Sequence, residues 1–146
     1  MTGLVHTDDS SRSLPVVAAV AAIGGGGTVI AGALLPWLTL FAGLYTYPGT
    51  TGPNGWFVLA GGVLAMLAGL GLIWKPRPSI GHAAGAVGLV LLGVSLWLVI
   101  QQQALLADLL EHHPMTVAGW GPGLLVVAAG AFMVALVPLF QILRRR

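Results

Sequence analysis

The chain has 146 residues, of which 57% are hydrophobic and 7% charged, with six basic side chains, four acidic ones and no cysteine. Soluble domains carry about 25% charged residues, so most of this surface does not face water. The composition excludes a soluble enzyme, a nucleic-acid-binding protein and a disulfide-stabilised secreted domain, and it indicates an integral membrane protein.

Four apolar stretches are long enough to cross a bilayer. They cover residues 14–35, 56–74, 79–101 and 122–143, and a membrane-spanning helix needs roughly 20 apolar residues. None of them alternates like a barrel strand, so helices are the expected structure in lipid. The sequence therefore predicts an all-α, four-transmembrane-helix bundle that forms one domain over residues 1–146, with outer loops at 36–55 and 102–121.

Small residues recur at four-residue intervals in the first three spans. Such rows let helices approach closely inside a membrane, where water exclusion cannot drive packing. Each row serves either packing within the bundle or docking of another membrane subunit, and Gly24, Gly61 and Gly85 are the candidate contacts for the second role. The rows contain Gly24, Thr28 and Gly32, then Gly61, Ala65 and Gly69, then Gly81 and Gly85.

The first outer loop is rich in aromatic residues. If residues 37–45 are helical, Trp37, Phe41 and Tyr45 lie along one face at intervals of four. A stripe of this kind suits a short helix at the level of the lipid head groups. We expect these three residues to contact a partner protein or lipid, and a connector that simply rests on the membrane is the alternative.

His82 is the only ionisable residue within the predicted spans. An ionisable group inside a membrane is a candidate for function. His82 either binds a haem or chlorin metal, or donates a hydrogen bond to a neighbouring subunit, or pairs with a carbonyl or phosphate near the interface. The sequence predicts no bound cofactor.

The third span continues into the second outer loop as an amphipathic helix that ends near Pro114. Asp108, Glu111 and His112 share one side of this extension, and their side chains are of the types that bind zinc or a similar ion. The alternative is the solvated polar end of a helix that docks on a partner. In the fourth span, Pro138 removes a backbone donor and predicts a kink.

The basic residues indicate the topology. They lie before span one, between spans two and three, and after span four, which places them all on one side of a four-span protein. Under the positive-inside rule both termini are cytoplasmic, in the inner membrane of a bacterial cell. This face also favours anionic phospholipid, by about 1 kcal/mol per basic group near the surface. The basic residues are Arg12, Lys75, Arg77, Arg144, Arg145 and Arg146.

The layout resembles that of other small membrane proteins. The first outer loop opens with Pro36-Trp37 and closes with Gly55-Trp56 between spans rich in small residues. This is similar to small four-helix membrane proteins of high-GC bacteria, and superficially similar to the claudin-like bundle. The outer β-sheet and the paired loop cysteines of the claudin-like family are expected to be absent.

The residues needed for several known membrane chemistries are missing from the predicted spans. There is no cysteine pair for thiol oxidation, no set of histidines for two haems, and no carboxylate for ion-coupled export. We therefore expect a non-catalytic accessory or stabilising subunit of a transport, secretion or respiratory complex. Its partners would be other integral membrane subunits and phospholipid, with no nucleic acid. The alternatives are a homo-oligomeric transporter or channel for a small or lipophilic molecule, and a haem- or pigment-binding subunit that uses His82.

Overall fold

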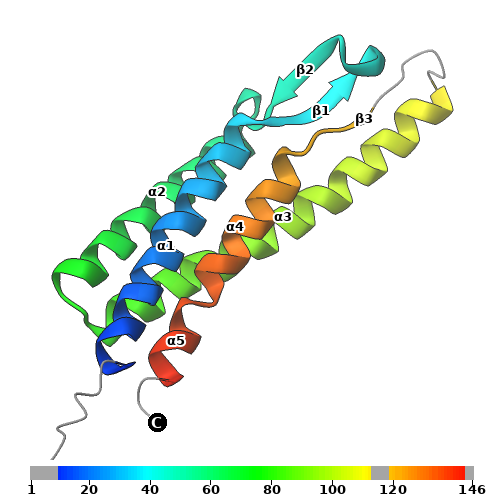
Figure 1. The fold of residues 1–146 in the computed structure, drawn as a ribbon. Coiled ribbons are helices and arrows are strands. Elements are labelled where there is room, and N and C mark those ends of the chain that lie inside the picture. Colours follow the sequence, from blue (N-terminus) through cyan, green and yellow to red (C-terminus); the bar gives the residue numbers. More distant parts are fainter. Residues whose placement is uncertain (1–9, 113–118, 144–146) are drawn as a thin grey trace, which may run out of the picture.

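The computed structural model describes residues 10–112 and 119–143 as a bundle of helices with a small β-sheet at one end (Figure 1). Four of its segments are long and apolar enough to cross a membrane, which confirms the prediction of a bundle with four apolar spans. The fourth segment, Gly123–Ile142, is made by two helices in succession. The helices are α1 (Ser10–Leu34), α2 (Pro53–Trp74), α3 (Pro78–His112), α4 (Gly123–Ala135) and α5 (Val137–Leu143).

Proline marks the start of two of these helices. Pro53 begins α2 and Pro78 begins α3, and a proline at the first helical position costs nothing because its missing N–H would be unpaired there. Three residues, 75–77, connect the two helices, so α2 and α3 run antiparallel beside each other (Figure 1). The extension of α3 to His112 confirms that the third span continues as a helix into the second outer loop.

Glycines allow α1 to pack closely against its two main neighbours, α2 and α4. A Cβ atom at Gly26 would lie 2.7 Å from the carbonyl oxygen of Gly62 on α2. A Cβ atom at Gly32 would lie 2.6 Å from the backbone nitrogen of Val127 on α4. Neither distance is possible for a real side chain, so these backbones approach each other only because both positions are glycine.

The fourth span is kinked, as predicted. Leu136 separates α4 from α5, and its N–H still donates to the carbonyl of Phe132 at 3.2 Å. Pro138 has no N–H to donate to the turn before it, and the Leu139 N–H donates instead to the carbonyl of Leu136 at 3.0 Å. The proline ring packs on Gly85 of α3, where a Cβ would overlap it.

The loops at one end of the bundle form a three-stranded antiparallel sheet in the order β2-β1-β3. The first loop supplies β1 (Pro36–Leu40) and β2 (Tyr45–Pro48), with short 3-10 helices η1 (Phe41–Gly43) and η2 (Gly49–Thr51) after them, and the second loop supplies β3 (Gly119–Trp120). The expectation of a helix over residues 37–45 is wrong. Aromatic residues and threonine favour strands when a partner strand is available, and Gly43, with φ of 94°, helps reverse the chain.

The expected absence of an outer sheet is therefore also wrong. Thr39 pairs with Thr46 in the hairpin and with Gly119 in β3, so the two loops are joined by backbone hydrogen bonds. The chain has no cysteine, so the other expected difference from the claudin-like bundle stands.

The interior consists of two clusters of mostly small apolar side chains. Near the sheet, Val29, Trp37 and Leu124 are among the buried members of the larger cluster. Toward the other end, Ala19, Leu72 and further small residues form the second cluster. Because the helices meet through alanine, glycine and valine, large side chains are left on the outside of the bundle.

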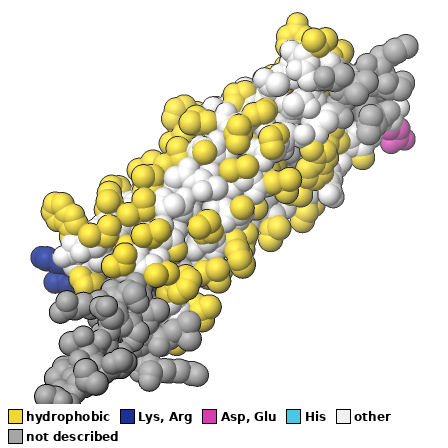
Figure 2. All heavy atoms as spheres, in the orientation of Figure 1, with side chains coloured by type: hydrophobic (Ala, Val, Ile, Leu, Met, Phe, Trp, Pro, Cys, Tyr) yellow, Lys and Arg dark blue, Asp and Glu magenta, His cyan; other side chains and the backbone are white. Residues whose placement is uncertain are grey.

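The outer surface of the bundle is apolar along its length, with charge at its ends (Figure 2). Leu67, Leu89 and Leu125 are each more than half exposed, which suits helices that lie in lipid. Among the described side chains, Lys75 and Arg77 lie in the connection between α2 and α3, and the acidic residues lie at the end of α3. We call the end of the bundle that holds the α2–α3 connection the basic end, and the end that holds the three strands the sheet end.

Candidate functional site

The tip of the β1–β2 hairpin exposes a group of large apolar side chains. Phe41, Leu44, Tyr45 and Tyr47 are 45%, 83%, 62% and 44% exposed, and we call them the hairpin-tip patch. The rings of Phe41 and Tyr45 meet edge to face with their centroids 6.0 Å apart. Phe41 has a φ of 52°, a left-handed conformation that is costly for a residue other than glycine. The expected contact residues Phe41 and Tyr45 therefore lie together on the surface.

Trp37, the third residue of the expected aromatic stripe, is buried. It is 6% exposed, and its indole N–H donates to the carbonyl of Gly32 at 2.9 Å. The ring lies against Gly49 and Gly123, at both of which a Cβ would overlap it. Trp37 thus joins α1, η2 and α4, and the expectation that it faces outward with the other two aromatic residues is corrected.

A pocket of about 650 Å³ lies between the sheet, η2 and the part of α3 that faces them. We call it the interfacial pocket. Trp37 and Leu98 supply apolar wall, while Asn54, Gln101 and Gln102 supply side-chain amides. Tyr47 and Thr51 add hydroxyl groups. None of the residues that line this pocket is charged, so it can form several hydrogen bonds without neutralising an ion.

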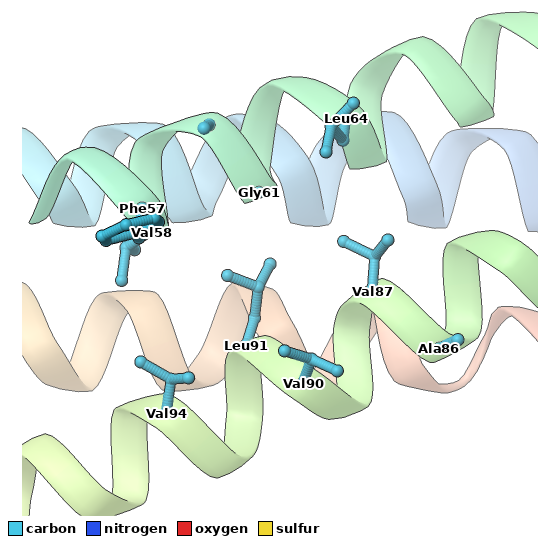
Figure 3. A pocket seen from close by; sticks show the side chains of 10 residues that line it. Phe57, Val58, Gly61, Leu64, Ala86, Val87, Val90, Leu91 and Val94 are labelled. Atoms are coloured by element: carbon cyan, nitrogen blue, oxygen red, sulfur yellow. The ribbon is translucent and has the colours of Figure 1, made fainter. Parts of the chain in front are cut away.

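A second cavity, of about 510 Å³, lies between α2 and α3 (Figure 3). We call it the apolar groove, because every side chain that lines it is apolar. Phe57, Val58 and Leu64 point into it from α2, and Val90 and Val94 are among the side chains that line it from α3. Leu91 reaches across to Gly61, where a Cβ would meet its methyl groups, and this contact closes the floor of the groove.

The structure separates the three glycines that were expected to contact a partner. Gly61 faces Leu91 of α3, and Gly85 faces Pro138 of α5, so both lie at contacts within the bundle. Gly24 is exposed, and a Cβ at this position would have no neighbour within 4 Å. Gly24 is therefore the one of the three that faces out of the bundle.

His82 is exposed near the basic end of α3. Its Nδ1–H donates to the carbonyl of Pro78, one turn earlier in the same helix, at 2.6 Å. This is the local pairing with a carbonyl that the sequence left open as an alternative to a haem ligand. His82 lines neither the interfacial pocket nor the apolar groove.

The expected metal ligands lie at the far end of α3. Asp108 and Glu111 are exposed on the extension of this helix, and the side chain of His112 lies outside the described part of the structure. Among the side chains that the structure describes, no three histidine, cysteine, aspartate or glutamate residues gather in a way that could hold a metal ion, and the expected trio with His112 stays a prediction.

The amide residues Asn54, Gln101 and Gln102 were not among the site residues predicted from the sequence. A signal for them is present in the chain, since residues 54, 57, 58, 61 and 64 follow one face of α2, and residues 87, 91, 94, 98 and 101 follow one face of α3. Each face changes from apolar to polar at the same end of the bundle.

Four segments that are long and apolar enough to cross a membrane, with no charged side chain in the middle of the described bundle, indicate a multi-pass membrane protein. No family model, no curated protein and no solved structure matches the chain.

Proposed function

We propose that this protein is a non-catalytic accessory subunit of a larger membrane assembly, which it joins through the hairpin-tip patch. The observation that supports this most directly is the exposure of the patch, where Leu44 is 83% and Tyr45 62% exposed. The hairpin from Pro36 to Pro48 contains no charged residue. Exposed aromatic and aliphatic side chains grouped in this way are typical of protein contact surfaces, because burying them favours association.

The conformation of the hairpin tip supports the same proposal. The left-handed backbone of Phe41 carries a strain of about 1–3 kcal/mol, and strain of this kind is concentrated at functional positions. It sets the Phe41 ring beside that of Tyr45 before any partner arrives. A contact surface that is already ordered loses less entropy on binding.

The sheet also offers a free edge. Among the described strands, β2 pairs with β1 alone, and all four residues of β2 are exposed. A strand edge of this kind can accept a strand from another chain. The partner that fits best is an integral membrane subunit with a domain beyond the bilayer.

The placement of the ionisable residues fits a non-catalytic role. His82 lies toward the basic end of α3, and Asp108 and Glu111 lie at the sheet end of the same helix. Acid–base chemistry needs such groups within hydrogen-bond reach of one substrate, and a separation of more than 20 residues along one helix keeps His82 from acting together with either carboxylate.

Purification of the tagged protein in mild detergent from its native membrane tests the proposal. We expect a defined partner protein to co-purify. Replacing Phe41 and Tyr45 by alanine should lower its yield strongly, because truncating a central interface aromatic costs about 2 kcal/mol or more, or about 30-fold in affinity. Thr46→Ala is the matched control, since Thr46 is exposed on the same strand between Tyr45 and Tyr47, and it should leave the yield unchanged.

Three results would contradict the proposal. A lone monodisperse monomer means that there is no stable assembly. A lone oligomer of defined size, stabilised by a small molecule, favours the transporter or channel. An absorption band that disappears in His82→Ala favours the haem- or pigment-binding subunit.

A further inference from the structure

We propose that the interfacial pocket and the apolar groove together bind one lipid molecule with an uncharged, hydroxyl-rich head group, which is a glycolipid of the leaflet at the sheet end. The head group would lie in the interfacial pocket and one acyl chain in the apolar groove. This site is separate from the hairpin-tip patch except for Tyr47, and it does not depend on the accessory role.

The two cavities follow one another along the same two helices. On α3, Leu98 of the interfacial pocket lies one turn from Val94 of the apolar groove. On α2, Asn54 lies one turn from Phe57 and Val58. Side chains at intervals of three and four share a helix face, so the α2–α3 seam offers polar groups at its outer end and apolar surface below them. This is the polarity of an amphiphile.

The length of the apolar groove fits a single leaflet. On α3 the groove extends from Val94 to Ala86, about 12 Å at 1.5 Å per residue, and Leu98 of the interfacial pocket lies one turn, about 6 Å, beyond Val94. The hydrocarbon core of one leaflet is about 15 Å thick, half of the roughly 30 Å of a bilayer. An acyl chain that starts at the interfacial pocket therefore ends where the groove ends.

The seam is closed toward the basic end. Leu72 is buried there, and Ile80 of α3 packs against its cluster. A Cβ at Gly71 would be in ordinary contact with Ile80, at 3.8 Å. A membrane-spanning helix of a partner needs a groove along the whole bundle, so this half-length groove fits an acyl chain better than a helix.

The uncharged amide side chains of the interfacial pocket favour a head group that carries hydroxyl groups and no charge. The amides of Asn54, Gln101 and Gln102 both donate and accept hydrogen bonds, as sugar hydroxyls do. No lining residue carries a positive charge for a phosphate, and Lys75 and Arg77 are at the opposite end of the bundle.

Native mass spectrometry of the full chain tests the proposal. The protein is purified in a polyoxyethylene detergent, which contains no sugar to compete, and is mixed with equal amounts of diglucosyl diacylglycerol and phosphatidylglycerol with the same acyl chains. We expect one bound glycolipid per chain, in preference to phosphatidylglycerol. Equal binding of the two lipids, or a preference for phosphatidylglycerol, would overturn the proposed selectivity.

Three variants separate the two parts of the site. Gln101→Ala with Gln102→Ala should lower glycolipid retention about tenfold, the effect of two lost hydrogen bonds of ordinary strength. Gln101→Lys with Gln102→Lys should reverse the preference toward phosphatidylglycerol, which a merely destabilised protein would not do. Ala86→Phe, at an exposed position that lines the groove, should lower retention by obstructing the acyl chain.

Ala129→Phe is the control for Ala86→Phe, because Ala129 is exposed on α4, which lines neither cavity. It should leave retention unchanged. Unchanged retention in Ala86→Phe would overturn the acyl-chain placement. Loss of a co-purifying protein from Ala86→Phe, with its lipid content unchanged, would assign the groove to a partner helix instead.

Discussion

At the residue scale, Gly26 and Gly27 are neighbours in the chain with opposite surroundings. A Cβ at Gly26 would lie 2.8 Å from the backbone nitrogen of Met66 on α2, whereas a Cβ at Gly27 would have no neighbour within 4 Å. The sequence shows a run of four glycines from 24 to 27 and cannot tell these roles apart, because they depend on which face of α1 meets α2.

The two positions therefore form a matched pair for mutation. We expect Gly26→Val to destabilise the protein by about 1–3 kcal/mol, the usual cost of forcing extra atoms into a packed contact. Gly27→Val should change the free energy of unfolding by less than about 0.5 kcal/mol, because a Cβ at this half-buried position has no neighbour within 4 Å. Unfolding in mixed detergent micelles measures both, and equal effects would mean that α1 does not present Gly26 to α2.

Trp37 shows how one residue links the membrane bundle to the sheet. Its indole N–H donates a hydrogen bond to the carbonyl of Gly32 in the last turns of α1. The backbone carbonyl of Trp37 accepts a hydrogen bond from the N–H of Gly121 at 3.0 Å. Local spacing suggested that its ring belongs with those of Phe41 and Tyr45. The ring is instead buried against Gly49 and Gly123. These glycines are distant from Trp37 in the sequence, so local spacing could not predict the contact.

At the scale of the elements, the pairing of β1 with β3 holds the two outer loops together. The Thr39 hydroxyl donates to the carbonyl of Gly119 at 3.1 Å, in addition to the backbone pairing. We expect Thr39→Val, which keeps the shape of the side chain, to weaken this junction by about 1 kcal/mol. Amide hydrogen exchange at residues 119–121 should become faster.

Thr46→Val is the control for that substitution, because Thr46 is exposed on β2, away from β3. It should leave exchange at residues 119–121 unchanged. If both variants exchange alike, the Thr39 hydroxyl does not contribute to holding β3.

The helices were predictable from the sequence and the sheet was not, for a physical reason. A span of about 20 apolar residues satisfies its own backbone hydrogen bonds, so composition and length identify it. The kink before Pro138 is also local. The β1–β3 pairing joins residues about 80 positions apart, and no pattern within either loop requires it.

The candidate site was predictable only in part. The exposed rings of Phe41 and Tyr45 lie in the loop that the sequence analysis singled out. The polar members of the interfacial pocket were not predicted, because Gln101 and Gln102 stand where the third predicted span, residues 79–101, ends. Their role depends on the distance between α2 and α3, which follows from packing across the whole bundle.

At the scale of the whole molecule, the described charges lie at opposite ends, which gives a direct test of orientation. The chain has no cysteine, so a single introduced thiol reports its own side of the membrane. We expect Glu111→Cys, at the sheet end, to react with a membrane-impermeant maleimide in spheroplasts. Pro76→Cys, in the connection at the basic end, should react only after permeabilisation, because the positive-inside rule predicts that Lys75 and Arg77 face the cytoplasm.

The two single-cysteine proteins serve as controls for each other. The reverse pattern of labelling would place the sheet in the cytoplasm and would remove the basis for an extracytoplasmic partner. Labelling of both in spheroplasts would mean that the chain inserts in two orientations.

The length of α3 indicates how far from the bilayer a partner must extend to contact the hairpin tip. Its 35 residues extend about 52 Å, and the hydrocarbon core of a bilayer is about 30 Å thick, so this helix is about 20 Å longer than a single crossing requires. The hairpin lies alongside α3 at the sheet end (Figure 1). A subunit that consists of one bare membrane-spanning helix is therefore too short to touch the hairpin tip. For the proposed accessory role, the partner therefore needs folded mass at that height above the bilayer, which narrows the search among co-purifying proteins.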